Sequence, residues 1–206
     1  FFLSRPRRFG KSLLISTLEA YFEAKRDLFE GLAVETLEKD WVKRPVLHLD
    51  LNIGKYDTPD SLDKILNETL DYWESLYGTR SAETTLALRF AGVVGRAYEQ
   101  SGERVAILID EYDKPLLQAI GNEELQREFR NTLKPFYGVL KTMDGCIKFA
   151  LLTGVTKFGK VSVFSDLNNL DDISMRKDYV EICGVSDQEL HDTLDAELHE
   201  FADVRG

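Results

Sequence analysis

The chain has 206 residues, 43% of them hydrophobic, and its 36 acidic and 26 basic residues give a formal net charge of −10. This length allows one sizeable hydrophobic core, or one core with a small appendage, and the acidic balance argues against a protein whose whole surface coats nucleic acid. No run of about 18 apolar residues occurs, so the sequence predicts no helix that spans a membrane.

The first half of the chain predicts strands and helices in alternation. Residues 1–4 are mostly apolar and predict the end of a strand; because no methionine precedes them, we expect the chain to be a piece of a longer protein. A leucine-rich run after Pro45 predicts a second strand. The elements predicted here are helices over residues 11–26, 60–77 and 82–100, and a strand over residues 46–51.

The second half continues this alternation. Residues 104–109 form a continuous apolar run, typical of a strand buried on both faces, and residues 147–152 predict a further strand. Between them a helix is predicted over residues 122–141, and Pro135 should kink or split it. This order indicates an α/β fold with a doubly wound, mainly parallel sheet and helices on both faces. Such sheets bind ligands at the carboxyl ends of their strands.

One main domain is expected over residues 1–185. Residues 186–201 are acidic and predict a helix, which we interpret as the start of a small helical C-terminal subdomain over residues 186–206. Cys146 and Cys183 are the only cysteines and lack the spacing of a zinc site. They predict reduced, partly buried thiols in a cytoplasmic protein.

The run from Ser4 to Ser12 has the composition of the second half of a phosphate-binding loop, because Gly10, Lys11 and Ser12 lead directly into a predicted helix. Such a loop offers phosphate its backbone N–H groups, a lysine for the β- and γ-phosphates, and a hydroxyl for Mg²⁺. The full consensus has glycine where this chain has Arg5. The residues expected to bind nucleotide are Arg7, Arg8, Phe9, Gly10, Lys11, Ser12 and Leu13.

Local charge favours an anionic ligand at this loop. Arg5, Arg7, Arg8 and Lys11 are the only charged residues before Ser12 and form a basic island in an acidic chain. The alternative is that these arginines are exposed to solvent and bind no ligand. Arg7 and Arg8 either cap phosphates or pair with carboxylates, and pairing is the better expectation without a ligand.

Two adjacent carboxylates follow the buried strand over residues 104–109. Asp110 is expected to hold Mg²⁺ together with Ser12, and Glu111 to activate the attacking water. The alternative is a pair of solvated carboxylates at a strand terminus. Thr153 ends the next strand and either senses the γ-phosphate or closes a turn at Gly154. The predicted catalytic residues are Glu111, Lys11 and Thr153.

A second phosphate-loop pattern, G-x-x-x-x-G-K, runs from Gly154 to Lys160. Val161 stands where the metal-binding hydroxyl belongs, and residues 161–166 are a poor helix start, so the helix N-terminus that captures phosphate is missing. The opening loop is therefore the favoured site. Lys157 and Lys160 remain candidates for a contact with phosphate or with a partner.

Two further residues carry weaker hypotheses. Asp50 follows the strand over residues 46–51 and either touches metal-bound water or, as we favour, caps the next turn. Arg176 is a candidate arginine finger toward a neighbouring subunit, in a homo-oligomer that the sequence leaves open.

Three parts of the sequence together resemble the bacterial AAA-ATPase-like family. They are the run from Phe2 to Ser12, the box from Asp110 to Leu116, and Leu152 to Lys157 followed by Asn168-Asn169-Leu170 and Asp172-Ile173-Ser174. The resemblance extends to about Val185, and arginine in place of glycine at Arg5 is typical of that family. It implies a P-loop fold of the added-strand, catalytic-glutamate branch that binds ATP and Mg²⁺ and hydrolyses ATP.

In that family a PD-(D/E)XK nuclease-like domain often follows the P-loop domain. No such domain lies in this sequence, so we expect neither nuclease activity nor direct nucleic-acid binding from it. The leading hypothesis is an ATPase that drives or switches this companion domain. The alternative is a non-catalytic nucleotide-binding module that recruits a protein partner, and Glu111 argues against it. A P-loop kinase is less favoured, because no arginine-bearing lid is evident.

Overall fold

A computed structural model describes residues 1–156, 170–184 and 186–205. At its centre lies an all-parallel, four-stranded sheet in the order β1-β4-β3-β2. The strands are β1 (Phe2–Ser4), β2 (Val46–Asp50), β3 (Val105–Asp110) and β4 (Ile147–Gly154). The expected α/β fold with a parallel sheet is confirmed.

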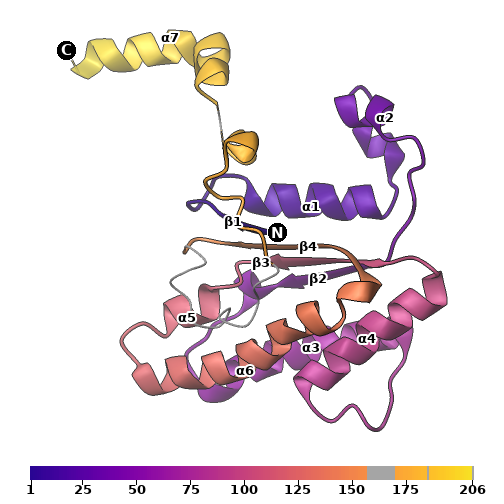
Figure 1. The fold of residues 1–206 in the computed structure, drawn as a ribbon. Coiled ribbons are helices and arrows are strands. Elements are labelled where there is room, and N and C mark those ends of the chain that lie inside the picture. The colour runs from indigo at the N-terminus through magenta and orange to yellow at the C-terminus, as the bar shows by residue number, and fades with distance from the viewer. Residues whose placement is uncertain (157–169, 185, 206) are drawn as a thin grey trace.

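Helices cover both faces of the sheet (Figure 1). The helix α1 (Lys11–Phe22) lies on one face. The other face carries α3 (Pro59–Tyr77), α4 (Leu86–Ser101) and α6 (Glu123–Thr142). The short helices are α2 (Ala33–Leu37) and α5 (Lys114–Gln118), and α7 (Asp187–Arg205) extends away from the sheet at the C-terminal end.

The strand β1 has neighbours on both sides. On one side it pairs with β4, where Phe2 lies opposite Leu152. On the other side the Phe2 N–H donates to the Asp171 carbonyl at 2.9 Å, and the Ile173 N–H donates to the Phe2 carbonyl at 3.0 Å. Residues 171–173 therefore run parallel to β1 along its outer side, although only a single bridge is formed there.

The hydrophobic core is unequal on the two faces. The larger cluster lies between the sheet and α3, α4 and α6, and it includes the stacked rings of Phe90 and Phe136, whose centroids are 4.6 Å apart. The smaller cluster, under α1, consists of Leu3, Ile15, Leu108, Leu151 and Ile173. Because β3 contributes to both clusters, all six of its residues are buried, as its continuous apolar run predicts.

In the first half of the chain, two helix boundaries differ from the sequence prediction by four residues. The helix α1 ends at Phe22 instead of Arg26, and a 3₁₀ turn over Arg26–Phe29 follows it. The helix α4 begins at Leu86, four residues after the predicted start, because the Thr85 hydroxyl accepts a hydrogen bond from the Leu88 N–H at 3.2 Å. Local capping thus fixes where α4 begins.

The prediction that Pro135 could split the helix over residues 122–141 is wrong, because α6 continues through it. Proline inside a helix costs about 3 kcal/mol or more. Leu133, Phe136, Tyr137 and Leu140 surround Pro135 on α6 and are fully or almost fully buried. Each such side chain contributes roughly 1.5–3 kcal/mol on burial, so packing outweighs the lost helix hydrogen bond.

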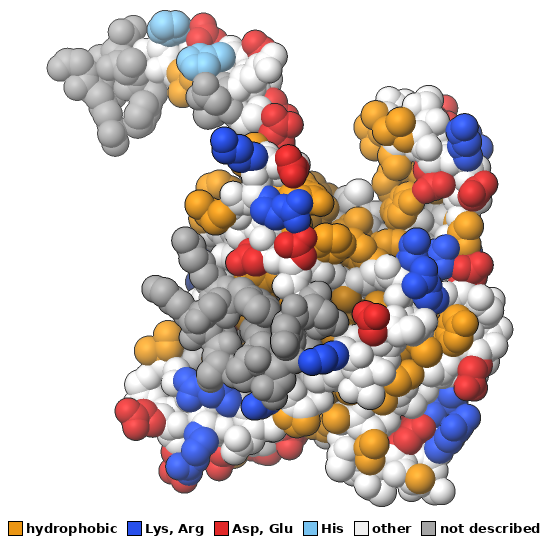
Figure 2. Space-filling model, in the orientation of Figure 1, with side chains coloured by type: hydrophobic (Ala, Val, Ile, Leu, Met, Phe, Trp, Pro, Cys, Tyr) orange, Lys and Arg blue, Asp and Glu red, His pale blue; other side chains and the backbone are white. Residues whose placement is uncertain are grey.

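The segment around α2 packs mainly through aromatic rings. Tyr21, Phe29 and Trp41 contact one another with centroid distances of 5.3 to 6.3 Å. Figure 2 shows hydrophobic side chains gathered over α2, where Leu37 is 78% exposed. The helix α2 itself buries no residue, so the rings hold this segment in place.

Other sequence expectations have mixed outcomes. A helix is present over most of residues 186–201, as predicted, whereas α5 and α2 were not anticipated. Within the described ranges, no helix is long and apolar enough to cross a membrane. Most of the second G-x-x-x-x-G-K pattern, including Lys157, Lys160 and Val161, lies outside the described residues.

Candidate functional site

A cavity of about 600 Å³ lies at the carboxyl edge of the sheet. Its walls come from segments that follow three strands: the loop after β1, the turn after β2, and the segment after β3. This is the edge where parallel α/β sheets bind ligands, and the volume is in the range of small-molecule sites. The lining residues are Arg7, Arg8, Gly10, Lys11, Ser12, Leu13, Asn52, Glu111, Lys114 and Gln118.

The loop after β1 turns sharply into α1. Gly10 is the N-cap residue with φ of 80°, and Arg8 also has a left-handed backbone with φ of 68°. Gly10 meets the requirement for positive φ without strain, whereas at Arg8 this conformation costs energy. No side chain of the described residues caps the N-terminus of α1, and its first turn contains no acidic residue. The N–H groups and positive dipole end of α1 are therefore available to an anion.

Lys11 is buried beneath this loop, with 4% of its surface exposed. Its Nζ donates to the carbonyl oxygens of Arg5 and Pro6, both at 3.1 Å. The same Nζ lies 3.3 Å from Oε1 of Glu111. The ammonium thus joins the loop to the carboxylate that follows β3.

Asp110 lies next to the loop hydroxyl. The Ser12 hydroxyl donates to Oδ2 of Asp110 at 2.6 Å, and the Thr153 hydroxyl donates to Oδ1. Asp110 is 3% exposed and Thr153 is fully buried, and neither residue lines the cavity. Thr153 is therefore not simply a turn-closing hydroxyl, because it holds the Asp110 carboxylate.

Glu111 has different surroundings from Asp110. Its side chain lines the cavity and is 16% exposed. Its backbone has φ of 54°, a left-handed conformation that is uncommon for a residue with a side chain. Such strain costs about 1–3 kcal/mol and is concentrated at functional sites. The turn directs one of two adjacent carboxylates into the core and the other into the cavity.

Arg5 does not face the cavity. Its guanidinium donates to the Ser174 carbonyl at 2.7 Å and to the Tyr179 carbonyl at 3.1 Å. The Ser4 N–H next to it donates to the Ser174 hydroxyl at 2.8 Å. Sequence analysis missed this role, because the partners lie about 170 residues away.

Arg7 and Arg8 are exposed and line the cavity. Within residues 1–156, 170–184 and 186–205 neither guanidinium forms an ion pair, so the expected pairing with carboxylates is not seen there. Phe9 is 43% exposed and is not part of the cavity lining, whereas Leu13 does line the cavity; the predicted contact of Phe9 with nucleotide stays a prediction. The aromatic ring of Phe9 lies close to Gly184.

The structure confirms one of the two weaker hypotheses, and the arginine finger stays a prediction. The Asn52 N–H donates to Oδ1 of Asp50 at 2.7 Å, which confirms the capping role for Asp50. Arg176 forms ion pairs with Asp171 and Asp178, and its guanidinium lies 5.2 Å from the ring centroid of Tyr179. Arg176 therefore has intramolecular partners in this chain.

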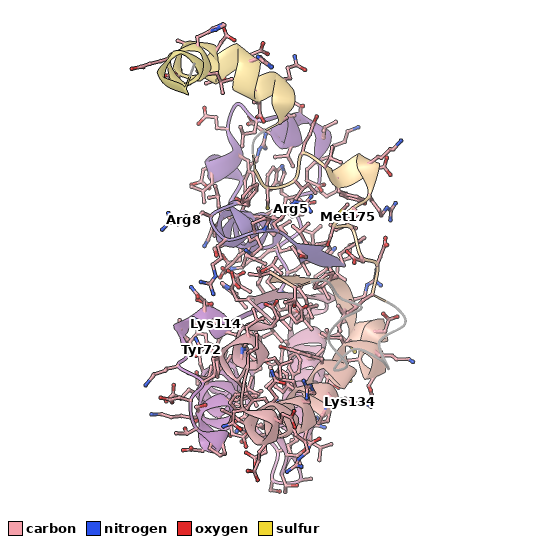
Figure 3. All side chains as sticks on the ribbon, turned by 90° about the vertical axis from the view of Figure 1, so that its left-hand side faces the viewer. Arg5, Arg8, Tyr72, Lys114, Lys134 and Met175 are labelled. Carbon is pink, nitrogen blue, oxygen red and sulfur yellow. The ribbon has the colours of Figure 1, made fainter. Side chains whose placement is uncertain are left out.

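Sequence analysis missed three lining residues, Asn52, Lys114 and Gln118. The Lys114 ammonium donates to the backbone carbonyl of Asn52 and to its Oδ1, the latter at 2.8 Å. Lys114 lies within the box from Asp110 to Leu116, which was the available signal. Figure 3 shows Lys114 and Arg8 on the same side of the molecule.

Asp113 connects the ends of β3 and β4. It is 1% exposed, and its Oδ2 accepts hydrogen bonds from the N–H groups of Val155, at 3.0 Å, and Thr156, at 2.6 Å. The residue before them, Gly154, is the last of β4, and a Cβ there would collide with the Tyr112 ring. Glycine at this position is thus required by close packing beneath the site.

Burial changes the acidity of two side chains near the site. It raises the pKa of the Tyr112 phenol well above its usual value, against the opposing effect of the hydrogen bond with Thr156. Burial also raises the pKa of the Cys183 thiol, although the nearby Arg5 and Lys11 cations act in the other direction. Both groups are therefore neutral at physiological pH.

The parallel α/β sheet, with a glycine-containing loop that runs from its first strand into a helix, is consistent with a P-loop-like fold. Residues 1–164 match the family model AAA-ATPase-like, described as predicted AAA-ATPase. The chain belongs to this family. The match confirms the resemblance that the motifs indicate. It ends at residue 164, whereas the resemblance of the motifs extends to about Val185.

The chain is also similar to a protein of Azotobacter chroococcum mcd 1 named "Uncharacterized protein in vnfD 5'region". The two sequences are 41% identical over 199 residues, which cover 96% of this chain. The same region is 38% of the relative, so the chain spans well under half the length of the curated relative it matches. No solved structure matches the chain.

Proposed function

We propose that this chain is an ATP-binding domain that hydrolyses ATP with Mg²⁺ and thereby drives or switches a companion domain in a longer protein. One observation carries the proposal: Lys11, Ser12, Asp110 and Glu111 come together at the N-terminus of α1, beside the cavity. Membership in a family of predicted AAA-ATPases supports the same activity. The greater length of the curated relative is in keeping with a companion domain.

The loop supplies the phosphate contacts. The uncapped N–H groups at the start of α1 can donate to phosphate oxygens, and the helix dipole adds a favourable field. Lys11 exchanges its carbonyl partners for the phosphates, and Arg7 and Arg8 neutralise charge from the cavity wall. Gly10 allows the backbone to approach the ligand closely.

Mg²⁺ fits the donor set around Ser12. A hydroxyl and a carboxylate 2.6 Å apart are hard oxygen donors, which Mg²⁺ prefers. The described residues contain no group of three or more His, Cys, Asp or Glu side chains arranged to hold a metal, and Mg²⁺ in nucleotide sites uses only one or two protein ligands. Bound Mg²⁺ neutralises charge on the β- and γ-phosphates. Ser12 and Asp110 would hold it, and Thr153 positions Asp110.

Glu111 is the proposed general base. Its carboxylate lies in the cavity wall, where it can accept a proton from the attacking water. In the nucleotide-free chain it pairs with Lys11. We infer that nucleotide draws Lys11 to the phosphates and so frees Glu111 for this role.

The strand order supports the added-strand, catalytic-glutamate branch of P-loop proteins. One strand, β4, separates the loop strand β1 from the carboxylate strand β3. Residues 171–173 extend the sheet on the outer side of β1. Thr153 at the end of β4 is adjacent to Asp110, as expected for a strand inserted between the two functional strands.

The proposal is tested by measuring nucleotide binding and steady-state ATP hydrolysis. Both are measured for the parent chain and for the variants Lys11→Ala and Glu111→Gln. Lys11→Ala should lose nucleotide affinity, whereas Glu111→Gln should bind ATP and lose turnover. Lys64→Ala, on the exposed face of α3, is the matched control. Thermal unfolding of each variant verifies that it is folded. If both variants hydrolyse ATP as fast as the parent, the site assignment is wrong.

A non-catalytic nucleotide-binding module is the second candidate, and the Lys11–Glu111 ion pair is the observation that favours it. If this pair persists in the bound state, Glu111 cannot act as a base. The parent chain would then bind ATP with Mg²⁺ and release it unchanged, so Glu111→Gln would have no turnover to lose.

A further inference from the structure

We propose that Lys114 is a further phosphate-binding cation, which contacts the terminal phosphate of a bound nucleoside triphosphate from the segment after β3. This role would let the site distinguish a triphosphate from a diphosphate. The inference rests on the proposed function and adds a residue to it that the sequence motifs do not assign.

The position of Lys114 is the first observation. It is the first residue of α5 and lines the same cavity as Arg8, Lys11 and Ser12. Its backbone N–H donates to the carbonyl of Glu111 at 2.9 Å, so one tight turn carries both side chains into the cavity wall. Figure 3 shows Lys114 and Arg8 on the same side of the molecule.

The second observation is that the partners of Lys114 are uncharged. Among the described residues, its ammonium donates only to the two oxygens of Asn52, a backbone carbonyl and an amide carbonyl. No ion pair joins it to a carboxylate among the residues that the structure describes. Asn52 is itself fixed by its N–H bond to Asp50. The charge of Lys114 is thus held in place without being neutralised.

The third observation is the charge balance of the cavity lining. Among the described residues, the lining has four cations, Arg7, Arg8, Lys11 and Lys114, and one carboxylate, Glu111, in a chain with a net charge of −10. A cleft lined mainly by one sign of charge attracts and concentrates ligands of the opposite sign. The first three cations belong to the loop and the start of α1, and Lys114 supplies positive charge from the start of α5, after β3.

These positions assign Lys114 to the terminal phosphate of the ligand. The loop and the start of α1 hold the phosphates that lie at the helix N-terminus. The proposed general base Glu111 activates the water that attacks the terminal phosphate. A cation from the same turn as Glu111 can therefore contact this phosphate, where negative charge accumulates during transfer. Lys114 would therefore contact a triphosphate and leave a diphosphate untouched.

The test is equilibrium binding of ATPγS and of ADP, each with Mg²⁺, by isothermal titration calorimetry. Lys114→Met should weaken ATPγS binding about ten-fold or more, as expected for a lost charge-assisted hydrogen bond. ADP affinity should stay within about two-fold, and Lys114→Arg should recover part of the ATPγS affinity. Lys64→Met on α3 is the matched control for loss of a surface lysine charge.

The outcomes separate this inference from the proposed function. If the parent chain binds neither nucleotide, the proposed function fails. If the parent binds both and Lys114→Met leaves the ratio of the two affinities unchanged, Lys114 has no role at the terminal phosphate. A fall in thermal stability with an unchanged ratio shows that the Lys114–Asn52 contact only joins α5 to the segment after β2, and it overturns the inference.

Asn52→Asp provides a second variant for the case that Lys114→Met does not fold. The new carboxylate is nearly isosteric with the amide and pairs with Lys114, so the ammonium stays in place but is neutralised. We expect ATPγS affinity to fall by a larger factor than ADP affinity. An equal fall for both nucleotides would reflect general repulsion and contradict the proposed contact.

Discussion

The two halves of the loop that follows β1 are built differently. Ser4 and Arg5 are tied to Ser174 and Tyr179 by hydrogen bonds, so this anchored half has its partners within the protein. Residues 7–13 form the open half, and all of them except Phe9 line the cavity, including the exposed Arg7 and Arg8. The anchored half fixes the loop, and the open half is left to meet a ligand.

This difference explains why the loop can dispense with the consensus glycine. The backbone at Arg5 does not take a positive φ, so glycine is not needed there for conformational reasons. An arginine can instead hold carbonyl groups of a distant segment. Positive φ occurs in the open half, at Arg8 and Gly10.

Restoring the consensus with Arg5→Gly should produce the largest effect. The change removes the guanidinium bonds to Ser174 and Tyr179. Hydrogen bonds from charged groups contribute roughly 1.5–3 kcal/mol each, and because Arg5 is only half-buried we expect the free energy of unfolding to fall by about 3 kcal/mol. Chemical denaturation of the parent and the variant measures this difference in the free energy of unfolding. Arg7→Gly in the open half is the control and should change stability far less.

Ser174→Ala should have the next largest effect. It leaves the Ser4 N–H, which now donates at 2.8 Å, without its acceptor. An unsatisfied buried donor costs about 1–3 kcal/mol, and we expect a loss of about 1–2 kcal/mol because Ser4 is only partly buried. Ser16→Ala, at an exposed position on α1, should be nearly neutral. Equal losses for the two variants would mean that Ser174 does not anchor the loop.

Arg8→Gly should separate stability from binding. A left-handed backbone costs a non-glycine residue roughly 1–2 kcal/mol, and glycine relieves this strain. The greater conformational freedom of glycine in the unfolded chain offsets about 0.5–1 kcal/mol of the stability gained in this way. We expect a net stabilisation of about 0.5 kcal/mol and a several-fold loss of nucleotide affinity. Thermal unfolding and calorimetric titration measure the two quantities. A destabilised variant would show that Arg8 has a structural partner.

Arg7→Ala should have the smallest effect, confined to binding. Its exposed charge contributes about 0.5–1 kcal/mol, which corresponds to roughly two- to five-fold in affinity. Because salt screens exposed charges, the difference from the parent should shrink when ionic strength rises. Titrations at low and high salt provide the measurement. A difference that is independent of salt would contradict a simple charge effect.

The sequence allowed the prediction of those features that depend on local patterns. The apolar run before Asp110 predicts a strand buried on both faces, and Gly10-Lys11-Ser12 predicts a loop that enters a helix. The rule that ligands bind at the carboxyl ends of parallel strands predicts that Ser12 and Asp110 lie together, and they are hydrogen-bonded.

Contacts between distant segments could not be predicted in this way. No local pattern identifies the carbonyls that Arg5 binds, or the pairing of Lys114 with Asn52. Thr153 was expected to face phosphate or a turn, and only the register of β4 against β3 brings its hydroxyl to Asp110. Tertiary packing likewise keeps α6 continuous through Pro135.

The pairing of β1 sets the order in which the molecule can assemble. This three-residue strand lies between β4 and residues 171–173, and the Ser4 N–H meets an acceptor 170 residues further along the chain. Contacts of such long sequence separation form late, because the intervening chain must first be ordered. Within this chain the loop therefore precedes the segment that anchors it, and it acquires its final shape only after that segment has been made. Nucleotide binding would therefore report that synthesis has passed Ser174 and that the whole body of the domain has folded.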